Sequence, residues 1–218
     1  IDTSKTDKFV GGSLSLKNHI NENFLIYGSI SKGYKAGGIN QNPYLYGDSR
    51  FYNPEYNLNL ELGSRIAWNN MNTNLALFNM QRTDQQVQIS TQKFEDDPNS
   101  FTYYTANATD GYNRGFEIET EINISDNLTI SNSIGYLMTH INEFSYNEFS
   151  EDDLTIITIV KGDREQAMAP KFNSSFNVHY THHSGLFING NITSKDDYYF
   201  SDSHDQKSKS YFLLNTDL

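Results

Sequence analysis

The sequence predicts an all-β fold, namely an antiparallel up-and-down transmembrane β-barrel. Three observations lead to this prediction: long runs of alternating apolar and polar residues, short and long links in regular succession, and no helical period. The alternating runs last roughly 9–13 residues. Strands of soluble proteins average about 5–6 residues, whereas a tilted strand needs about 9–11 to cross a bilayer. The length of the runs therefore favours a membrane.

Nine strands are expected, with an incomplete last one, at 8–17, 24–34, 55–68, 73–90, 105–124, 128–142, 167–182, 186–200 and 210–218. The short links, such as Ser125-Asp126-Asn127 and His183-Ser184-Gly185, use residue types that favour tight hairpins. Long links at 35–54, 91–104 and 143–166 alternate with them. Outer-membrane barrels have this asymmetry, with short turns at one end and longer loops at the other.

Each clear run has one apolar face and one polar face. Glu117, Glu119 and Glu121 share the face opposite Phe116 and Ile118. Burying three glutamates in a dry core would cost several kcal/mol each, unless they were paired. A barrel avoids this cost, because the glutamates face a wet or plugged lumen while the apolar face contacts lipid.

The strand expected at 73–90 has a less clear register, because both of its faces carry apolar residues. We expect Leu75 and Leu77 to point outward. Nine strands also leave two sheet edges, and unpaired backbone groups are not tolerated in lipid. Partner strands are therefore expected beyond both ends, and a start at Ile1 without a signal peptide predicts a fragment.

Composition excludes several classes of function. A net charge of −11 argues against a nucleic-acid partner, which requires a basic surface. The absence of cysteine excludes disulfides, thiolate metal sites and cysteine nucleophiles. Acidic clusters in the long links are expected to solvate loops, or alternatively to bridge through divalent cations to anionic surface lipid.

Three histidines raise the question of a metal site. His179, His182 and His183 lie close in sequence, but neighbours on one strand point to opposite faces, so they do not converge on one ion. No metal or other cofactor is expected. No Ser-His-Asp set or paired glycosidase carboxylates stand out, so the chain is not expected to be an enzyme.

The first long link is rich in aromatic and basic residues, namely Lys35, Tyr44, Tyr46, Arg50 and Tyr52. One interpretation is loop packing together with the aromatic girdle of the barrel. The other is contact with a ligand, because aromatic rings and arginine provide rigid contact area and the cations attract an anionic chelate.

Several segments together resemble TonB-dependent outer-membrane receptors of the siderophore and iron-complex type. The resemblance covers essentially all of 1–218 and rests on the order and spacing of these motifs rather than on any one of them. The segments are Tyr27–Asn40, Asn53-Pro54-Glu55, Glu61-Leu62-Gly63, Asn113–Glu119, Ala169-Pro170 and Asp197-Tyr198-Tyr199.

The resemblance implies the C-terminal portion of a barrel of about 22 strands with a plugged lumen. The plug domain and the signal peptide are expected to lie outside 1–218. It implies an outer-membrane receptor of a Gram-negative bacterium for active uptake of an iron–siderophore or similar scarce ligand. Its partners would be TonB, the ligand and outer-membrane lipid. The alternatives are a passive porin-like or adhesive outer-membrane barrel and a soluble β-sandwich binding module.

Glycines in these motifs have a local interpretation. Gly33, Gly37 and Gly38 are expected to let the backbone leave the strand and turn at the barrel rim. Gly115 is expected to mark a bulge or a close approach to a neighbouring strand.

Overall fold

The computed structural model describes residues 4–42, 45, 50–92, 94, 97–150 and 155–218 of the 218-residue chain. This part is all-β, as the sequence predicts. Its strands are β1 (Gly12–Asn21), β2 (Phe24–Lys35), β3 (Gly38–Ile39), β4 (Phe51–Tyr52), β5 (Glu55–Trp68), β6 (Met71–Thr83), β7 (Gln86–Gln92), β8 (Phe101–Asn107), β9 (Asp110–Ser125), β10 (Leu128–Ile141), β11 (Phe144–Ser150), β12 (Thr155–Lys161), β13 (Phe172–Thr181), β14 (Phe187–Lys195) and β15 (Tyr211–Asp217). The described residues include no helix long and apolar enough to cross a membrane.

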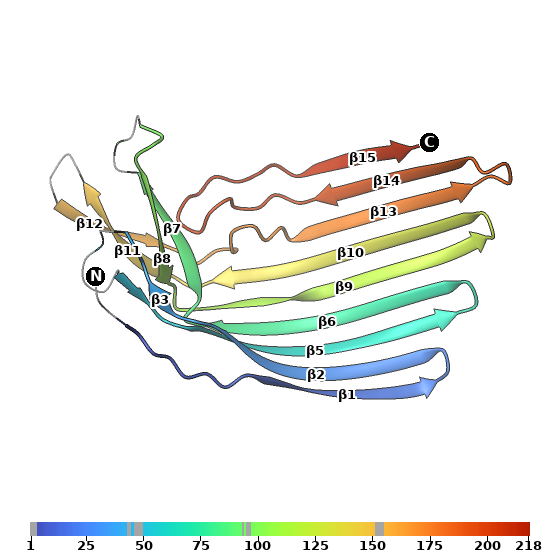
Figure 1. Cartoon of the computed structure of the whole chain (residues 1–218), viewed down its shortest axis with the longest axis horizontal. Helices are drawn as coiled ribbons and strands as arrows, with labels where there is room; N and C mark the ends of the chain where they lie inside the picture. The colour runs from blue at the N-terminus through green and yellow to red at the C-terminus, as the bar shows by residue number, and fades with distance from the viewer. Residues whose placement is uncertain (1–3, 43–44, 46–49, 93, 95–96, 151–154) are drawn as a thin grey trace.

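One curved sheet contains nine of these strands in the order β1-β2-β5-β6-β9-β10-β13-β14-β15 (Figure 1). Every neighbouring pair is antiparallel, and the spatial order follows the chain order, so the sheet is an up-and-down meander. This confirms the predicted number and succession of long strands. In the described part of the chain the sheet ends at β1 and β15 and does not close into a barrel.

The links between these strands alternate in length, and all short ones lie at one end of the sheet (Figure 1). Two of the tight turns contain a residue with positive φ, Asn69 at 44° and Gly185 at 90°. Asparagine and glycine tolerate this left-handed conformation better than other residues, which explains why they occupy these turns. The long links lie together at the opposite end, as predicted.

Cross-strand register assigns the two faces. Leu62 lies opposite Leu77, Leu77 lies opposite Phe116, and Phe116 lies opposite Tyr136. Directly paired residues share a face, so one apolar face continues across β5, β6, β9 and β10. The prediction that Leu75 and Leu77 belong to the apolar face is confirmed, since Leu75 pairs with Ile118. We call this the outward face, and the face that carries Glu61 and Glu117 the inward face.

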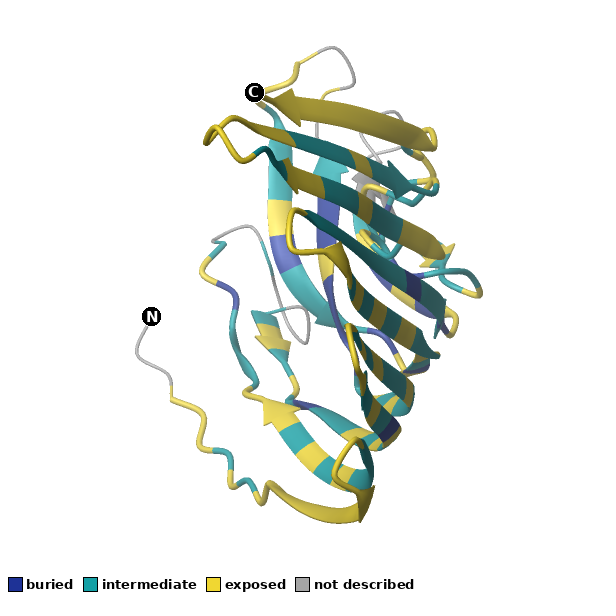
Figure 2. Ribbon diagram, turned by 90° about the vertical axis from the view of Figure 1, so that its right-hand side faces the viewer, coloured by how far each residue is buried: buried dark blue, intermediate teal, exposed yellow. Residues whose placement is uncertain are grey.

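The outward face is exposed to an extent that excludes a soluble sandwich. Leu62 is 58% exposed and Leu77 is 46% exposed. A sandwich buries one face of each sheet against a second sheet, whereas no second sheet covers these strands in the described part of the chain (Figure 2). Alternate residues on the strands instead leave large apolar side chains uncovered, as a strand in lipid requires.

Five of the nine expected strands differ from the structure by more than one residue at an end. Those expected at 167–182 and 186–200 are shorter, at Phe172–Thr181 and Phe187–Lys195. The strand expected at 73–90 is interrupted after Thr83, where Asp84 has a φ of 52° and separates β6 from β7. The strand expected at 105–124 is interrupted at Ala108 and Thr109, between β8 and β9. The first strand occupies Gly12–Asn21 rather than 8–17. The periodicity continues through each interruption, so local pattern alone did not locate it.

The prediction that the long links are loops was wrong in part. They contain two-stranded sheets, β3 with β4, β7 with β8 and β11 with β12. The physical reason is that their apolar residues find partners in neighbouring links rather than in the main sheet. We call these links, at 36–54, 84–109, 142–166 and 196–210, the loop cap.

Candidate functional site

The loop cap contains the buried apolar core. Among the described residues, every buried large apolar side chain lies in it or at its junction with the sheet, and the core consists of Val87, Ile89, Tyr104, Ala108, Ile141, Phe144 and Tyr146. Ile89 is fully buried. The cap is therefore a packed unit at one end of the sheet, and it is the candidate ligand-binding region of the chain.

A buried ion pair joins the cap to the sheet. Glu55 is 5% exposed and accepts hydrogen bonds from the Arg82 guanidinium, with N–O distances of 2.6 and 2.7 Å. Its second oxygen accepts the Gln86 backbone N–H at 2.9 Å. Arg82 also donates to Gln166 Oε1 at 2.8 Å. Removing one partner of such a pair leaves an uncompensated buried charge, so the pair holds three segments in one arrangement.

The Gln166 side chain is the hub of a second network. Its Nε2 donates to Asn113 Oδ1 at 2.8 Å and to the His140 carbonyl at 3.1 Å, and its backbone N–H donates to Thr139 Oγ1 at 3.0 Å. The residue is 5% exposed. A buried amide with satisfied polar atoms fixes the geometry around it, so Gln166 ties the third long link to β9 and β10.

Two asparagines tie the first long link to the second. The Asn40 side chain donates to the Thr105 carbonyl at 2.8 Å and accepts the Thr105 N–H at 2.9 Å. Asn107 in the same way accepts the Asn53 N–H at 2.6 Å and donates to the Asn53 carbonyl at 3.1 Å. Each amide therefore pairs with backbone as a neighbouring strand would, which stabilises the relative position of the two links.

Arg164 anchors the last described link of the cap. Its guanidinium donates to the carbonyls of Ser201, Asp202 and His204 at 3.0, 2.8 and 2.9 Å. It also forms an ion pair with Asp205 at 2.6 Å and lies over the Tyr199 ring at 4.1 Å. One side chain thus satisfies several carbonyls of a segment that has little regular structure.

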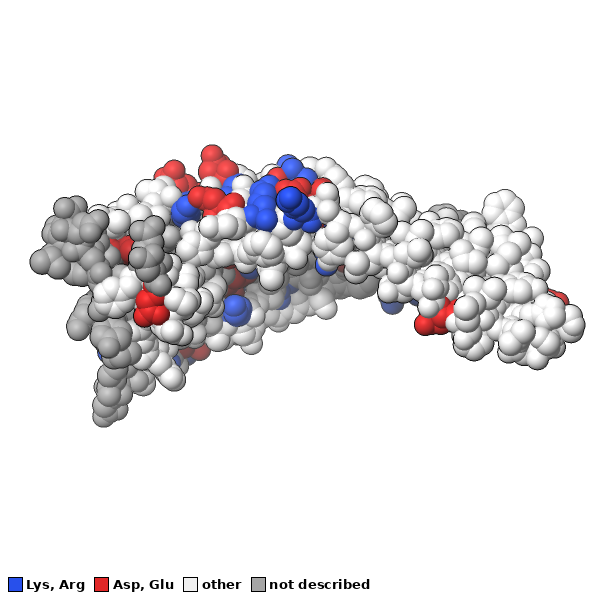
Figure 3. Space-filling view, turned by 90° about the horizontal axis from the view of Figure 1, so that it is seen from above, with Lys and Arg blue, Asp and Glu red and all other residues white. Residues whose placement is uncertain are grey.

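Further ion pairs surround this anchor. Lys161 pairs with Asp205 at 2.7 Å, and Glu165 pairs with Lys171 at 2.5 Å and with Lys207 at 3.5 Å. Figure 3 shows basic and acidic side chains side by side over the long-link end, whereas the opposite end is largely uncharged on this face. Charges that neutralise one another in this way order the cap rather than present a strong net field.

These contacts shift acidic pKa values in two directions. Hydrogen bonds from Lys171 and Lys161, respectively, lower the pKa of Glu165 and of Asp205. Burial instead raises the pKa of Asp202, whose carboxylate accepts the Ala167 N–H at 3.1 Å. Burial also raises the pKa of Tyr104 to about 12, so its hydroxyl stays neutral over the physiological range.

Acidification is expected to loosen segment 196–208. Glu165 and Asp205 have lowered folded-state pKa values, so their stabilisation is present above their ordinary values of 4.5 and 3.8 and is lost as pH falls through the lowered ones. The protection factors of the 196–208 amides in the complete receptor, that is, their exchange relative to the intrinsic rate at each pH, should fall below about pH 4. Unchanged protection factors down to pH 2 would contradict this expectation.

Asp202→Asn is the matched control for the pH experiment. A raised carboxyl pKa means that ionisation costs stability above that pKa, and that the cost is removed as pH falls. Replacing Asp202 by asparagine should therefore leave the protection of 196–208 at pH 7 equal or higher, while the acid loosening from Glu165 and Asp205 persists.

The structure gives different environments to the residues predicted to bind ligand. Lys35 is exposed at the end of β2. Arg50 is half-buried, and its guanidinium donates to the Leu45 carbonyl at 2.9 and 3.2 Å. Tyr52 is half-buried in β4. Tyr44 and Tyr46 lie outside the described residues.

The rim glycines serve close approach rather than a left-handed turn. The positive-φ glycines of the described chain are Gly162 and Gly185, so Gly37 and Gly38 have ordinary backbone conformations. A Cβ on Gly38 would lie 2.3 Å from the Tyr52 hydroxyl oxygen, so the tyrosine ring covers this glycine. The close approach predicted at Gly115 is confirmed, since a Cβ there would lie 1.9 Å from the Tyr136 carbonyl oxygen.

The histidines do not form a metal cluster. The rings of His182 and His183 are 3.8 Å apart in the turn, and His182 Nδ1 lies 2.8 Å from Ser184 Oγ. His179 instead contacts Asn189 on the neighbouring strand. Among the described residues, no group of three or more His, Cys, Asp or Glu side chains is placed to hold a metal ion.

Sequence reasoning missed Arg164 and Gln166. Neither stands in a periodic pattern, and their partners are far away along the chain, at Asp205 and Arg82. The only local signal was the run of charged and amide residues at the end of the third long link.

Known proteins share this architecture. A family model described as TonB dependent receptor-like, beta-barrel matches residues 2–218. The ferric yersiniabactin uptake receptor FyuA from Yersinia pestis superposes with a TM-score of 0.71 at 16% identity, over 94% of this chain and 29% of that chain. The siderophore receptor PiuA from Acinetobacter baumannii gives 0.69 at 18% identity, over 95% and 29%.

A third structure, the copper transporter OprC, gives a TM-score of 0.68 at 11% identity, over 94% of this chain and 31% of that chain. At such identities these likenesses show the fold. The chain spans about three-tenths of the length of each of these structures. The match of the family over 2–218, on a meander with one apolar and one polar face, identifies the chain as a member of the TonB-dependent receptor β-barrel family.

Proposed function

We propose that this chain is the C-terminal portion of the barrel of an outer-membrane receptor that takes up an iron–siderophore complex or similar scarce ligand, with energy supplied through TonB. The observation that carries the proposal is the family match over 2–218. The exposed outward face supports membrane insertion, because it gives lipid an apolar surface on every long strand.

The inward face supports a wet or plugged lumen. Glu61 accepts a hydrogen bond from the Tyr27 hydroxyl at 2.8 Å, while Glu117, Glu119 and Glu121 are exposed on the same face. Carboxylates without buried cationic partners are stable only next to water or next to a polar partner surface. A plug domain with a polar surface fits this face, and the barrel strands are the wall around it.

The loop cap supports ligand capture at the outer end. Its packed core and its anchors, Gln166 and Arg164, give it a preformed shape, and preformed sites lose less entropy on binding. The names of two similar structures, a ferric yersiniabactin uptake receptor and a siderophore receptor, favour an iron chelate as the ligand class.

Uptake measurements test the proposal. Cells that lack the complete gene should lose accumulation of radiolabelled iron supplied as a siderophore, and the cloned gene should restore it. Deleting TonB in the restored cells should abolish accumulation again. Accumulation that persists without TonB, together with ion conductance of the purified protein in planar bilayers, would identify a passive pore instead.

Arg50→Ala is expected to weaken ligand binding by the complete receptor about tenfold, which corresponds to about 1.4 kcal/mol. The guanidinium both orders the first long link through the Leu45 carbonyl and supplies a positive charge near the proposed ligand. Titration of the purified receptor with a fluorescent ferric siderophore measures the effect. Lys17→Ala, which removes an exposed cation from β1, is the charge-matched control, and equal affinities for both variants would remove Arg50 from the site.

A further inference from the structure

Charged side chains on the outward face of the nine-stranded sheet are confined to its long-link end. Lys32 shares this face with Leu58, and Arg114 shares it with Asn79 and Met138. Between these two cations and the short turns, the outward positions of the nine described strands carry no Asp, Glu, Lys or Arg. Lys32 therefore lies at the border of the apolar surface.

The spacing along β5 places this border at a membrane interface. From Leu58, at the level of Lys32, to Trp68 at the other end is ten residue steps, about 34 Å along the strand at about 3.4 Å per residue. A strand tilt of about 40° reduces this to a height of about 26 Å, close to the apolar band of about 25 Å in outer-membrane barrels. Lys32 is thus at headgroup level.

The Tyr56 ring lies beside the Lys32 ammonium group, and Phe9, which adjoins Tyr56, stacks on Tyr34. The Lys32 Nζ lies 5.9 Å from the centre of the Tyr56 ring, and Tyr34 stacks on Phe9 with ring centres 4.2 Å apart. Lys32 forms no ion pair with any carboxylate in the described chain. Its charge is therefore available to an anion from outside the protein, in the position where lipid headgroups lie.

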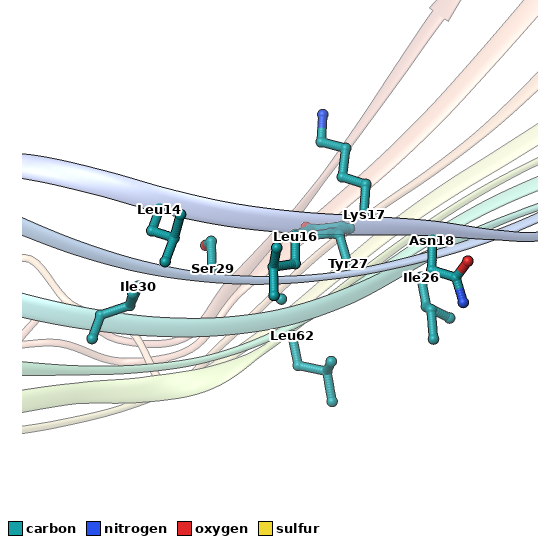
Figure 4. A pocket seen from close by; sticks show the side chains of 10 residues that line it. Leu14, Leu16, Lys17, Asn18, Ile26, Tyr27, Ser29, Ile30 and Leu62 are labelled. Carbon is teal, nitrogen blue, oxygen red and sulfur yellow. The ribbon is translucent and has the colours of Figure 1, made fainter.

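A mainly apolar hollow of about 410 Å³ begins at Leu14 and Ile30, one outward position from Lys32, and extends towards the membrane centre. It forms over Gly28, which pairs with Leu16 on one side and Leu62 on the other, and its rim includes Leu14 and Ile30 (Figure 4). Only the Glu61 carbonyl oxygen lies within 4 Å of the place where a Gly28 Cβ would be, at 3.9 Å. The missing side chain therefore leaves an open depression between larger residues.

The cation and the hollow have the spacing of one lipid molecule. Lys32 and Gly28 are four residues apart on β2, about 14 Å along the strand. A phosphate held by Lys32 places the acyl chains of the same lipid against Ile30 and Gly28. The Lys17 side chain points to the side opposite Leu62, so the lining of the hollow is mainly apolar, although it includes Asn18 (Figure 4).

We propose that β1, β2 and β5 form a binding site for one membrane lipid with an anionic, phosphate-bearing headgroup. Lys32 binds the phosphate beside Tyr34 and Tyr56, and an acyl chain fills the hollow over Gly28. The inference rests on the proposed membrane location of the barrel, and it adds a defined lipid partner in the leaflet next to the loop cap.

Native mass spectrometry of the complete receptor tests the site. The receptor is reconstituted in nanodiscs that contain equal amounts of phosphatidylglycerol and phosphatidylcholine, then released and analysed with its retained lipid. The wild-type protein should retain phosphatidylglycerol preferentially. Lys32→Gln should lower that retention about fivefold and abolish the preference. Gly28→Leu should lower retention of both lipids, because it fills the hollow.

Arg114→Gln and Gly190→Leu are the matched controls. Arg114 is an outward cation that stacks on Tyr112 at 4.3 Å, outside the hollow, and Gly190 is an outward glycine with no neighbour at its Cβ position. Both should keep the wild-type retention. If Lys32→Gln lowers lipid retention no more than Arg114→Gln, or Gly28→Leu no more than Gly190→Leu, the retained lipid is bound unspecifically and the site does not exist. A receptor that folds without detergent or lipid would instead overturn the proposed function.

Discussion

Arginine at Leu60, Ile130 and Phe176 together is expected to prevent assembly of the barrel in the complete receptor. Leu60 is 50% exposed and Phe176 is 44% exposed on the outward face, and Ile130 pairs with Val178 on the same face. Arginine on the lipid face costs about 2–4 kcal/mol at the bilayer midplane and less near the interfaces. Leu60 lies only one outward position inside the border at Leu58, so its cost is below the midplane range. The three changes on separate strands are together expected to cost about 3 kcal/mol or more, a substantial part of a typical folding free energy of about 5–15 kcal/mol.

The assembled fraction is measured by the heat-dependent shift of folded barrel in gel electrophoresis of outer-membrane fractions. The control introduces the same three arginines one residue away, at Asn59, Ser131 and Asn177. These positions lie on the inward face, because adjacent residues on a strand point to opposite sides. The control variant should assemble. Undisturbed assembly of the outward variant would show that this face does not contact lipid.

Gly115→Ala is expected to destabilise the barrel by about 3 kcal/mol or more, at the upper end of overpacking effects. The added Cβ would lie 1.9 Å from the Tyr136 carbonyl oxygen and 3.0 Å from its carbonyl carbon. Both are backbone atoms of β10, which is held by a continuous ladder to β9 and cannot rotate away as a side chain would. Urea unfolding of the receptor in lipid vesicles measures the change.

Gly190→Ala is the matched control for this prediction. Gly190 also lies within a strand of the same sheet, in β14, but nothing is within 4 Å of its Cβ position. Its unfolding free energy should change by less than about 1 kcal/mol. If the two alanine variants were equally stable, β9 and β10 could move apart to accept the added methyl group at little cost in free energy. That result would contradict the prediction for Gly115.

The ligand contacts predicted in the first long link stay a prediction. Aromatic and basic residues marked the first long link, and Arg50 does have a defined role there through the Leu45 carbonyl. Residue type does not tell whether such a side chain orders a loop or touches a ligand, since both need the same donors. The strongest anchors of the cap, Arg164 and Gln166, lie in a different link, where no sequence pattern predicted them.

The sequence by itself determined the long strands, their order and their faces. The reason is that these features are local: alternation with a period of two assigns the faces, as at Leu75 and Leu77, and Asn- and Gly-rich turns join neighbours in the chain.

Only the tertiary structure decided how the long links fold onto one another. Gln166 meets Arg82 across 84 positions and Ser203 meets Ser90 across 113. Contacts at such separations depend on the curvature that brings strand ends together, and no local period encodes them. The broken strands at Asp84 and Thr109 follow from the same contacts, because the chain leaves the main sheet where packing in the loop cap replaces pairing with the next long strand.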